Sequence, residues 1–194
     1  MLFPAALLAE QFTRGNHDAL GQQAFENEQL WPYPIIDPIA QASILVDRSG
    51  NRFTDEGLGV VYMANEVAKL DDPLAATAIF DEAVWTGIAA DNRYPPCMNP
   101  VFEQAGGTVL HAPDLAGLAA QIGVPAEALE KTVAEYNVAI AGGSVASLSP
   151  ARSTHRAEPQ PIATAPFRAI PVCAGITYTM GGIAIDRDGR VQNR

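Results

Sequence analysis

Apolar positions along the chain alternate with polar ones in some segments and recur every three or four residues in others. Apolar runs bounded by turn residues predict short strands at 42–47, 76–81, 108–112, 167–174, 176–180 and 182–186. Because these strands interleave with helices but do not alternate with them regularly, the pattern favours an α+β fold over a doubly wound parallel sheet.

Helical periodicity marks the segments between and after these strands. Apolar residues share one helical face between 58 and 70, and a short helix is expected after Asp81. Asp114 is placed to cap a helix that Gly123 ends. Pro125 suits the first turn of a longer helix, whose apolar stripe is formed by Leu129, Val133, Tyr136 and Ile140.

Two long segments show neither pattern. Residues 14–41 are expected to be irregular, with Pro32, Pro34 and Pro38 holding the chain extended. Residues 143–165, rich in Ser, Ala, Pro and Thr, are expected to form a surface excursion. The N-terminal apolar run is interrupted by a proline and follows no basic residues, which indicates a packed segment and no signal peptide.

Composition and charge narrow the function classes. The 194 residues are 48% hydrophobic and 18% charged, as in globular proteins, and the net charge is −10. This acidity argues against nucleic acid or an anionic membrane surface as a partner. The two cysteines lie far apart without a CxxC pattern, so reduced thiols in a cytoplasmic protein are expected.

Several short motifs carry little weight. "GLGVVY" at 57–62 lacks the third glycine and the buried leading strand of a dinucleotide-binding loop. "DRSGN" and "DRDGR" are explained by hairpin turns, since Leu58 stands where a calcium loop beginning at Asp47 needs glutamate. The three histidines have no metal-ligand spacing, and no GxSxG occurs. The residues therefore predict no metal site and no hydrolase nucleophile.

Four phrases in a fixed order carry more information. They are "ILVDRSGNRFTDE" (44–56), "AIFDEAV" (78–84), "LAGLAAQIGVPAEALEKTVAEYN" (115–137) and "PFRAIPVCAGITYTMGGIAIDRDGRV" (166–191). Together they resemble the flavoprotein family of fumarate reductases and succinate dehydrogenases, which includes tricarballylate-, urocanate- and ketosteroid-acting members. In that family a capping domain closes over an FAD-binding domain. The resemblance covers roughly residues 42 to 191.

The resemblance implies a particular domain organisation. Residues 1–41 would connect to the flavin domain, 42–174 would form the capping substrate domain, and 175–194 would return toward the flavin domain. The chain would then lack the glycine-rich FAD-binding unit and be a fragment of a longer flavoprotein. FAD would belong to the full-length parent, and the chain alone is expected to bind none.

The resemblance also implies site residues near the end of the chain. Thr179 and Met180 match the family's "TMGG" phrase, and Gly181 and Gly182 would approach substrate or flavin, although a plain turn explains them equally well. Thr177, followed by Tyr178, stands where fumarate-type members carry a histidine that binds a substrate carboxylate. A hydroxyl brings no positive charge, which weakens the case for a dicarboxylate substrate.

Three further residues match the family less firmly. Arg52 matches the "RF" of the family phrase, with a turn-stabilising role as an equal alternative. Glu56 matches the acidic residue of the family's proton path. Arg93 is a candidate for the arginine that donates the proton, with a solvated loop residue as the alternative.

Two functions remain open from the sequence. The first is the substrate-binding cap of an FAD-dependent oxidoreductase acting on a C–C bond next to a carbonyl or carboxylate. The second is a stand-alone ligand-binding or interaction domain that kept the fold without catalysis. Apolar ends, "MLFPAALL" and "GGIAI", also predict self-association.

Overall fold

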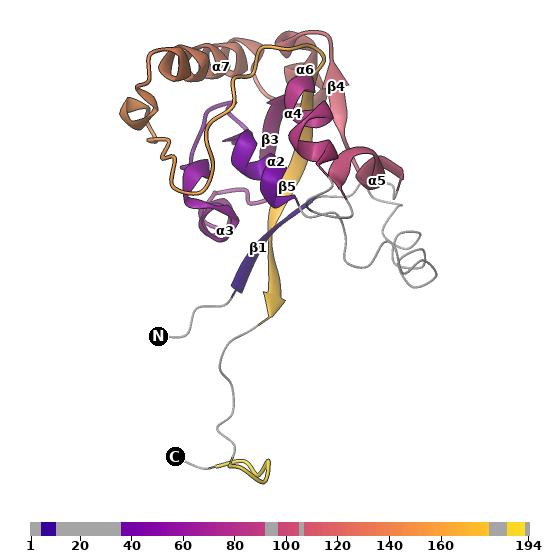
Figure 1. Cartoon of the computed structure of the whole chain (residues 1–194), viewed down its shortest axis with the longest axis vertical. Helices are drawn as coiled ribbons and strands as arrows, with labels where there is room; N and C mark the ends of the chain where they lie inside the picture. The colour runs from indigo at the N-terminus through magenta and orange to yellow at the C-terminus, as the bar shows by residue number, and fades with distance from the viewer. Residues whose placement is uncertain (1–4, 11–35, 92–96, 105–106, 179–185, 193–194) are drawn as a thin grey trace.

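The computed structural model describes residues 5–10, 36–91, 97–104, 107–178 and 186–192, with backbone alone at 5–10 and 176–178. These residues form a small antiparallel sheet and a set of helices (Figure 1), which confirms the predicted mixed α+β class. The strands are β1 (Ala5–Glu10), β2 (Ile44–Val46), β3 (Ala76–Asp81), β4 (Leu110–Ala112) and β5 (Phe167–Tyr178). The α-helices are α2 (Asp37–Ala42), α3 (Val60–Val67), α4 (Glu82–Thr86), α5 (Met98–Gln104), α6 (Leu115–Ile122) and α7 (Ala126–Ala141). Short 3-10 helices are η2 (Glu56–Leu58), η3 (Ile88–Ala90) and η4 (Val145–Ser147).

The sheet is organised around β5, its longest strand at 12 residues. The strand order is β1-β5-β3-β2, and β4 also pairs with β5. The first half of β5 pairs with β3 and β4, whereas its second half pairs with β1. As Figure 1 shows, the end of β5 runs on past the helices, whereas β1 lies next to α3.

Helices cover both faces of the sheet because side chains alternate along each buried strand. In β2 and β3, Leu45, Ala78 and Phe80 face a core cluster shared with α2, α3, α4 and α5. Their neighbours Ile44 and Ile79 face a second cluster shared with α6 and α7. β3 is buried along its whole length, as expected for a strand covered on both sides.

The strand at the end of the chain differs from its prediction. The sequence predicted separate strands at 167–174 and 176–180, but β5 runs unbroken from Phe167 to Tyr178. Gly175, read as a break, occupies an ordinary ladder position opposite Leu7. β5 therefore passes through the predicted domain boundary after residue 174. The predicted strand at 182–186 lies mostly outside the described residues.

The segment before β2 also differs from its prediction. Residues 37–41 were expected to be irregular, yet Asp37–Ala42 forms α2, and β2 begins only at Ile44. Pro38 lies in the first turn of this helix. The missing N–H of a proline costs nothing there, so the residue taken as extended is compatible with a helix start.

The later helices follow the sequence closely. Asp114 caps α6 by accepting the N–H of Gly117 at 2.6 Å, and Gly123 ends it in the left-handed conformation with φ 73°. Pro125 precedes α7, in which Leu129, Val133 and Tyr136 are buried as predicted. The surface excursion at 143–165 is only partly confirmed, because Arg152 and Ile162 within it are buried.

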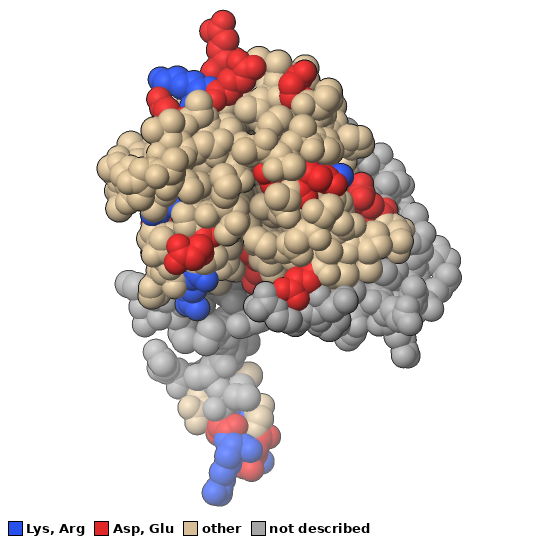
Figure 2. Space-filling model, turned by 45° about the horizontal axis from the view of Figure 1, so that its top comes forward, with Lys and Arg blue, Asp and Glu red and all other residues tan. Residues whose placement is uncertain are grey.

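Figure 2 shows the charged side chains on one face of the molecule. On the face shown in Figure 2, basic side chains lie next to acidic ones and do not gather into a patch. None of the described helices is long and apolar enough to cross a membrane. The described residues also contain no group of three or more side chains suited to a metal ion.

Candidate functional site

The described structure brings together two of the predicted site residues, Arg52 and Glu56, close to the end of β2. Thr177 and Tyr178 form the last two positions of β5, where Tyr178 pairs with Ala5 of β1. The remaining predicted residues, Arg93, Thr179, Met180, Gly181 and Gly182, lie outside the described residues. The site can therefore be built upward from the first pair.

The turn after β2 sets the position of both residues. The Asp47 carboxylate accepts the N–H groups of Ser49 and Asn51, and the N–H of Gly50 bonds to the Asp47 carbonyl at 3.0 Å. Gly50 has φ 76°, a conformation that favours glycine. This turn returns the chain so that Arg52 bridges Val46, which confirms the reading of "DRSGN" as a hairpin turn.

Glu56 lies in the interior and is bound on both carboxylate oxygens. Its Oε1 accepts the backbone N–H of Leu45 at 2.9 Å and the Nε–H of Arg52 at 3.2 Å. Its Oε2 accepts from Nη2 of Arg52 at 2.6 Å. The side chains of Arg52 and Glu56 are only 5% and 0% exposed. This two-oxygen pairing ties the turn to strand β2.

Arg52 uses most of its remaining donors on the backbone. Nη1 donates to the carbonyl of Pro150 at 2.9 Å, and Nη2 also donates to the carbonyl of Thr54 at 3.0 Å. With both Glu56 bonds, four of its five N–H groups are engaged. The geometry thus supports the turn-stabilising reading of Arg52, and substrate binding by it stays a prediction.

A second guanidinium, that of Arg152, completes this cluster and was missed by the sequence reasoning. Arg152 is fully buried, and its Nε lies 3.8 Å from Oε2 of Glu56. Its Nη2 donates to the carbonyls of Gln41 at 2.8 Å and Ala157 at 3.2 Å, and Nη1 donates to Ser153. The only signal in the sequence was an arginine inside a stretch interpreted as surface loop.

Tyr136 of α7 forms the wall of the cluster. Its ring lies 5.5 Å from the Arg52 guanidinium carbon, within the range of a cation–π contact. Burial, with the Glu56 carboxylate adding to it, raises the pKa of Tyr136 to about 12, and the two guanidiniums oppose that shift. Among the described residues its buried hydroxyl has no hydrogen-bond partner.

The glycines beside this cluster do not fit a dinucleotide cofactor. A β-carbon at Gly57 would collide with the backbone of Ser153, and one at Gly59 would lie 3.3 Å from Cγ of Arg156. The Gly57 carbonyl already accepts the N–H of Arg156 at 2.9 Å. A pyrophosphate needs open backbone at such a turn, whereas here the chain's own segment covers it. The described residues offer no other glycine-rich strand-to-helix turn.

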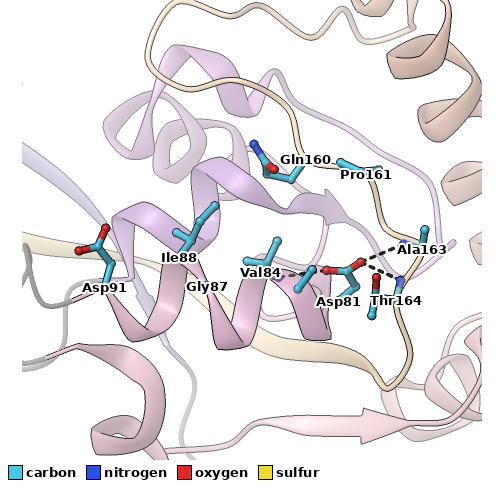
Figure 3. Close-up of a pocket in the computed structure, with 10 residues that line it drawn as sticks. Asp81, Val84, Gly87, Ile88, Asp91, Gln160, Pro161, Ala163 and Thr164 are labelled. Carbon is cyan, nitrogen blue, oxygen red and sulfur yellow. Dashed lines mark hydrogen bonds between the residues drawn. The ribbon is translucent and has the colours of Figure 1, made fainter.

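A hollow of about 280 Å³ lies between α4 and the segment before β5 (Figure 3). Asp81, at its edge, accepts the N–H of Val84 at 3.1 Å and so caps α4. Its second oxygen accepts the N–H groups of Ala163 at 3.0 Å and Thr164 at 2.9 Å. The carboxylate thus accepts three backbone N–H groups and joins α4 to the segment before β5, which explains its burial without a ligand.

A second arginine–glutamate pair lies at the start of β5. Nε of Arg168 donates to Oε2 of Glu82 at 2.7 Å, and the guanidinium carbon lies 5.1 Å from the ring of Trp85. The side chains of Arg168 and Glu82 are 13% and 27% exposed. Unlike Glu56, Glu82 therefore remains accessible to water.

Comparison with known proteins gives this geometry a context. A family model described as "FAD binding domain" matches residues 20–194. The chain is 30% identical over 148 residues to NADH:acrylate oxidoreductase of Vibrio harveyi, covering 76% of this chain and 14% of that protein. It is 31% identical over 167 residues to NADH:fumarate oxidoreductase of Klebsiella pneumoniae, covering 86% of this chain and 16% of that protein. The chain thus spans well under a quarter of either relative.

A solved structure is similar to three quarters of the chain. The open conformation of a flavocytochrome c3 fumarate reductase superposes with a TM-score of 0.59 and 25% identity. The match covers 75% of this chain and 23% of that one. The likeness is therefore to one part of a much larger flavoprotein.

Proposed function

Because the chain belongs to the fumarate reductase and succinate dehydrogenase flavoprotein family, we propose that it supplies the substrate-facing capping domain of an FAD-dependent oxidoreductase. The observation that carries this proposal is the match of its helix-covered sheet to 23% of a fumarate reductase. The absence of an open dinucleotide turn among the described residues agrees with a cap and not with the FAD-binding unit.

The proposed reaction is reduction or dehydrogenation of a C–C bond next to a carbonyl or carboxylate. The relatives named for acrylate and fumarate support this substrate class. In the proposal Thr177 to Met180 contact the substrate, Arg93 supplies the proton, and Glu56 belongs to the proton path. The redox chemistry belongs to FAD, and this chain contributes substrate orientation and exclusion of water.

The position of β5 supports the placement of the substrate side. β5 begins in the core at Phe167 and ends at Thr177 and Tyr178, beyond the helical body (Figure 1). The first half of β5 pairs with both β3 and β4, so it gives the residues that follow a rigid attachment to the sheet. A site at its far end would be presented to a neighbouring domain.

The experiment that tests the proposal begins with the coding sequence on either side of this chain. If it encodes a GxGxxG strand-to-helix unit, the whole product is purified and assayed with a reduced viologen dye as electron donor. Fumarate, acrylate and a 3-ketosteroid are compared as acceptors. Substrate-dependent dye oxidation, lost in Arg93→Gln and kept in the exposed-loop control Arg48→Gln, is the expected result.

The alternative function predicts a different outcome. If no flavin-binding unit is encoded nearby and the chain binds a ligand or protein without redox activity, the binding-module reading replaces the enzyme. We also expect the 194-residue chain alone to be colourless and to leave the fluorescence of added FAD unquenched. Stoichiometric flavin in the purified chain would place the cofactor site among residues that we have not assigned to it.

A further inference from the structure

The buried cluster around Glu56 contains one residue whose position neither the motifs nor the family comparison explains. Arg152 lies nearly a hundred positions after Glu56 in the sequence, yet both side chains are fully buried and adjacent. We propose that Arg152 is a positioning residue, which fixes the orientation of Glu56 and of the turn that carries it. The functional meaning rests on the proposed function, in which Glu56 belongs to the proton path.

The geometry of Arg152 is that of a fork, and not of a simple counter-ion. Its Nη groups bind backbone carbonyls of three separate positions, Gln41, Ser153 and Ala157. These bonds hold the guanidinium beside Glu56, with Nε 3.8 Å from Oε2 of the carboxylate. A lysine could supply the charge but not the several directed N–H groups.

The segment 152–156 contacts residues 55–57, which include the start of η2, through three other hydrogen bonds. Oδ1 of Asp55 accepts the backbone N–H of Ser153 at 2.9 Å and the Ser153 hydroxyl at 3.3 Å. The N–H of Arg156 donates to the carbonyl of Gly57 at 2.9 Å. A β-carbon at Gly57 would collide with both Ser153 and Arg152, so the close approach requires glycine there. The contacts make residues 152–156 and 55–57 one packed unit.

The buried cluster of Arg52, Glu56 and Arg152 contains more positive than negative charge. Two guanidiniums face a single carboxylate in the interior. Nε of Arg152 has no hydrogen-bond partner among the described residues, so this guanidinium is held by the bonds of its Nη groups and by the charge of Glu56 at 3.8 Å. Displacing Arg152 would therefore remove the second positive charge beside Glu56 and leave the carboxylate bound by Arg52 and the Leu45 N–H. The bond from Leu45 N–H to Glu56 Oε1 then becomes a local reporter of the orientation of Glu56.

Hydrogen exchange on the 194-residue chain tests this without flavin or substrate. We expect Arg152→Gln and Arg152→Lys to accelerate exchange of the Leu45 amide by about tenfold or more, because both lose the directed bonds to Gln41, Ser153 and Ala157 that hold the guanidinium beside Glu56. The Val84 amide, bound to Asp81 in a separate region, should keep its rate. Arg156→Gln, an exposed arginine of the same segment whose backbone makes the Gly57 contact, is the matched control and should change neither amide.

Three results would overturn the proposal. Restored Leu45 protection in Arg152→Lys would mean that charge alone suffices, and equal acceleration at Leu45 and Val84 would mean general destabilisation. If neither variant folds, native-state exchange of the unmodified chain decides: Leu45, Ser153 and Arg156 amides should open with one common free energy. Separate opening energies would show that the segment and the turn are independent. Failure of the flavoprotein assay would leave each of these readings unaffected.

Discussion

The chain contains two arginine–glutamate pairs of nearly equal length in very different surroundings. Arg52–Glu56 is 2.6 Å and Arg168–Glu82 is 2.7 Å, and each arginine also lies over an aromatic ring. The first pair is buried, shares its carboxylate with a strand N–H, and faces a second guanidinium. The second is partly exposed to water, on the central strand β5 and the first residue of α4.

The difference teaches that distance alone says little about what an ion pair contributes. A partly exposed pair gains little Coulomb energy, because water solvates each partner well when the pair is broken. In a buried pair, removing one partner leaves an uncompensated charge in the interior. The same Glu→Gln substitution at positions 56 and 82 therefore compares a buried with a partly exposed ion pair.

The largest effect is expected for Glu56→Gln. It keeps the shape of the side chain but leaves two buried guanidiniums without an anion, so the free energy of unfolding should fall by about 3–5 kcal/mol. Urea unfolding followed by circular dichroism measures this change. A loss below about 1 kcal/mol would mean that water or another anion already compensates the positive charge of the two guanidiniums.

Asp81→Ala should have the next largest effect. Its carboxylate accepts three backbone N–H groups, one at the start of α4 and two in the segment before β5. Leaving them unpaired should cost about 2–3 kcal/mol. The control Asp114→Ala removes an exposed cap with a single acceptor bond on α6 and should cost about 1 kcal/mol. Equal losses in urea unfolding would show that the two bonds before β5 contribute nothing.

These two aspartates also show which parts of the fold the sequence could predict. Asp81 and Asp114 act on residues three positions ahead, and local spacing is enough to place the helix starts that they cap. The strand β3 and the stripe of α7 were predicted for the same reason, since their pattern is local. Pro38 misled the prediction because a proline suits both an extended chain and a first helical turn.

The candidate site was less predictable because its contacts are not local. Glu56 and Arg52 are four residues apart and share a known phrase, so the sequence found them. Arg152 binds Gln41 from 111 positions away, and no periodicity reports such a contact. The segment 143–165 is rich in Ser, Ala and Pro, which predicts exposure, and Arg152 is buried because the fold packs this segment against residues 55–57.

A small effect is expected for Glu82→Gln, the partly exposed counterpart of Glu56→Gln. The pair with Arg168 is partly solvated, so its loss should lower the free energy of unfolding by about 0.2–1 kcal/mol. Salt should shrink even this difference, since screening weakens exposed pairs more than buried ones. Urea unfolding at low and high sodium chloride measures both quantities. A salt-independent loss as large as that of Glu56→Gln would show that burial does not distinguish the contributions of the two ion pairs to stability.

The smallest effect near neutral pH is expected for Tyr136→Phe, which alters the wall of the buried cluster without touching either charge. Among the described residues the hydroxyl has no hydrogen-bond partner, and phenylalanine keeps the ring over Arg52. The free energy of unfolding should therefore change by less than about 0.5 kcal/mol. A loss well above this would show that the hydroxyl is bonded in solution.

Alkaline pH makes the same variant informative. The pKa of Tyr136 is raised from 10.0 to about 12, mainly by burial, so the folded chain keeps a proton that the unfolded chain releases. The stabilising effect of that retained proton is complete below pH 10 and is lost as the pH rises from about 10 through about 12. The unmodified chain should thus lose stability over this window relative to Tyr136→Phe, and urea unfolding at several pH values measures the gap. Parallel curves for the two chains would mean that the Tyr136 hydroxyl reaches water in the folded state, and that the cluster is more open than its geometry implies.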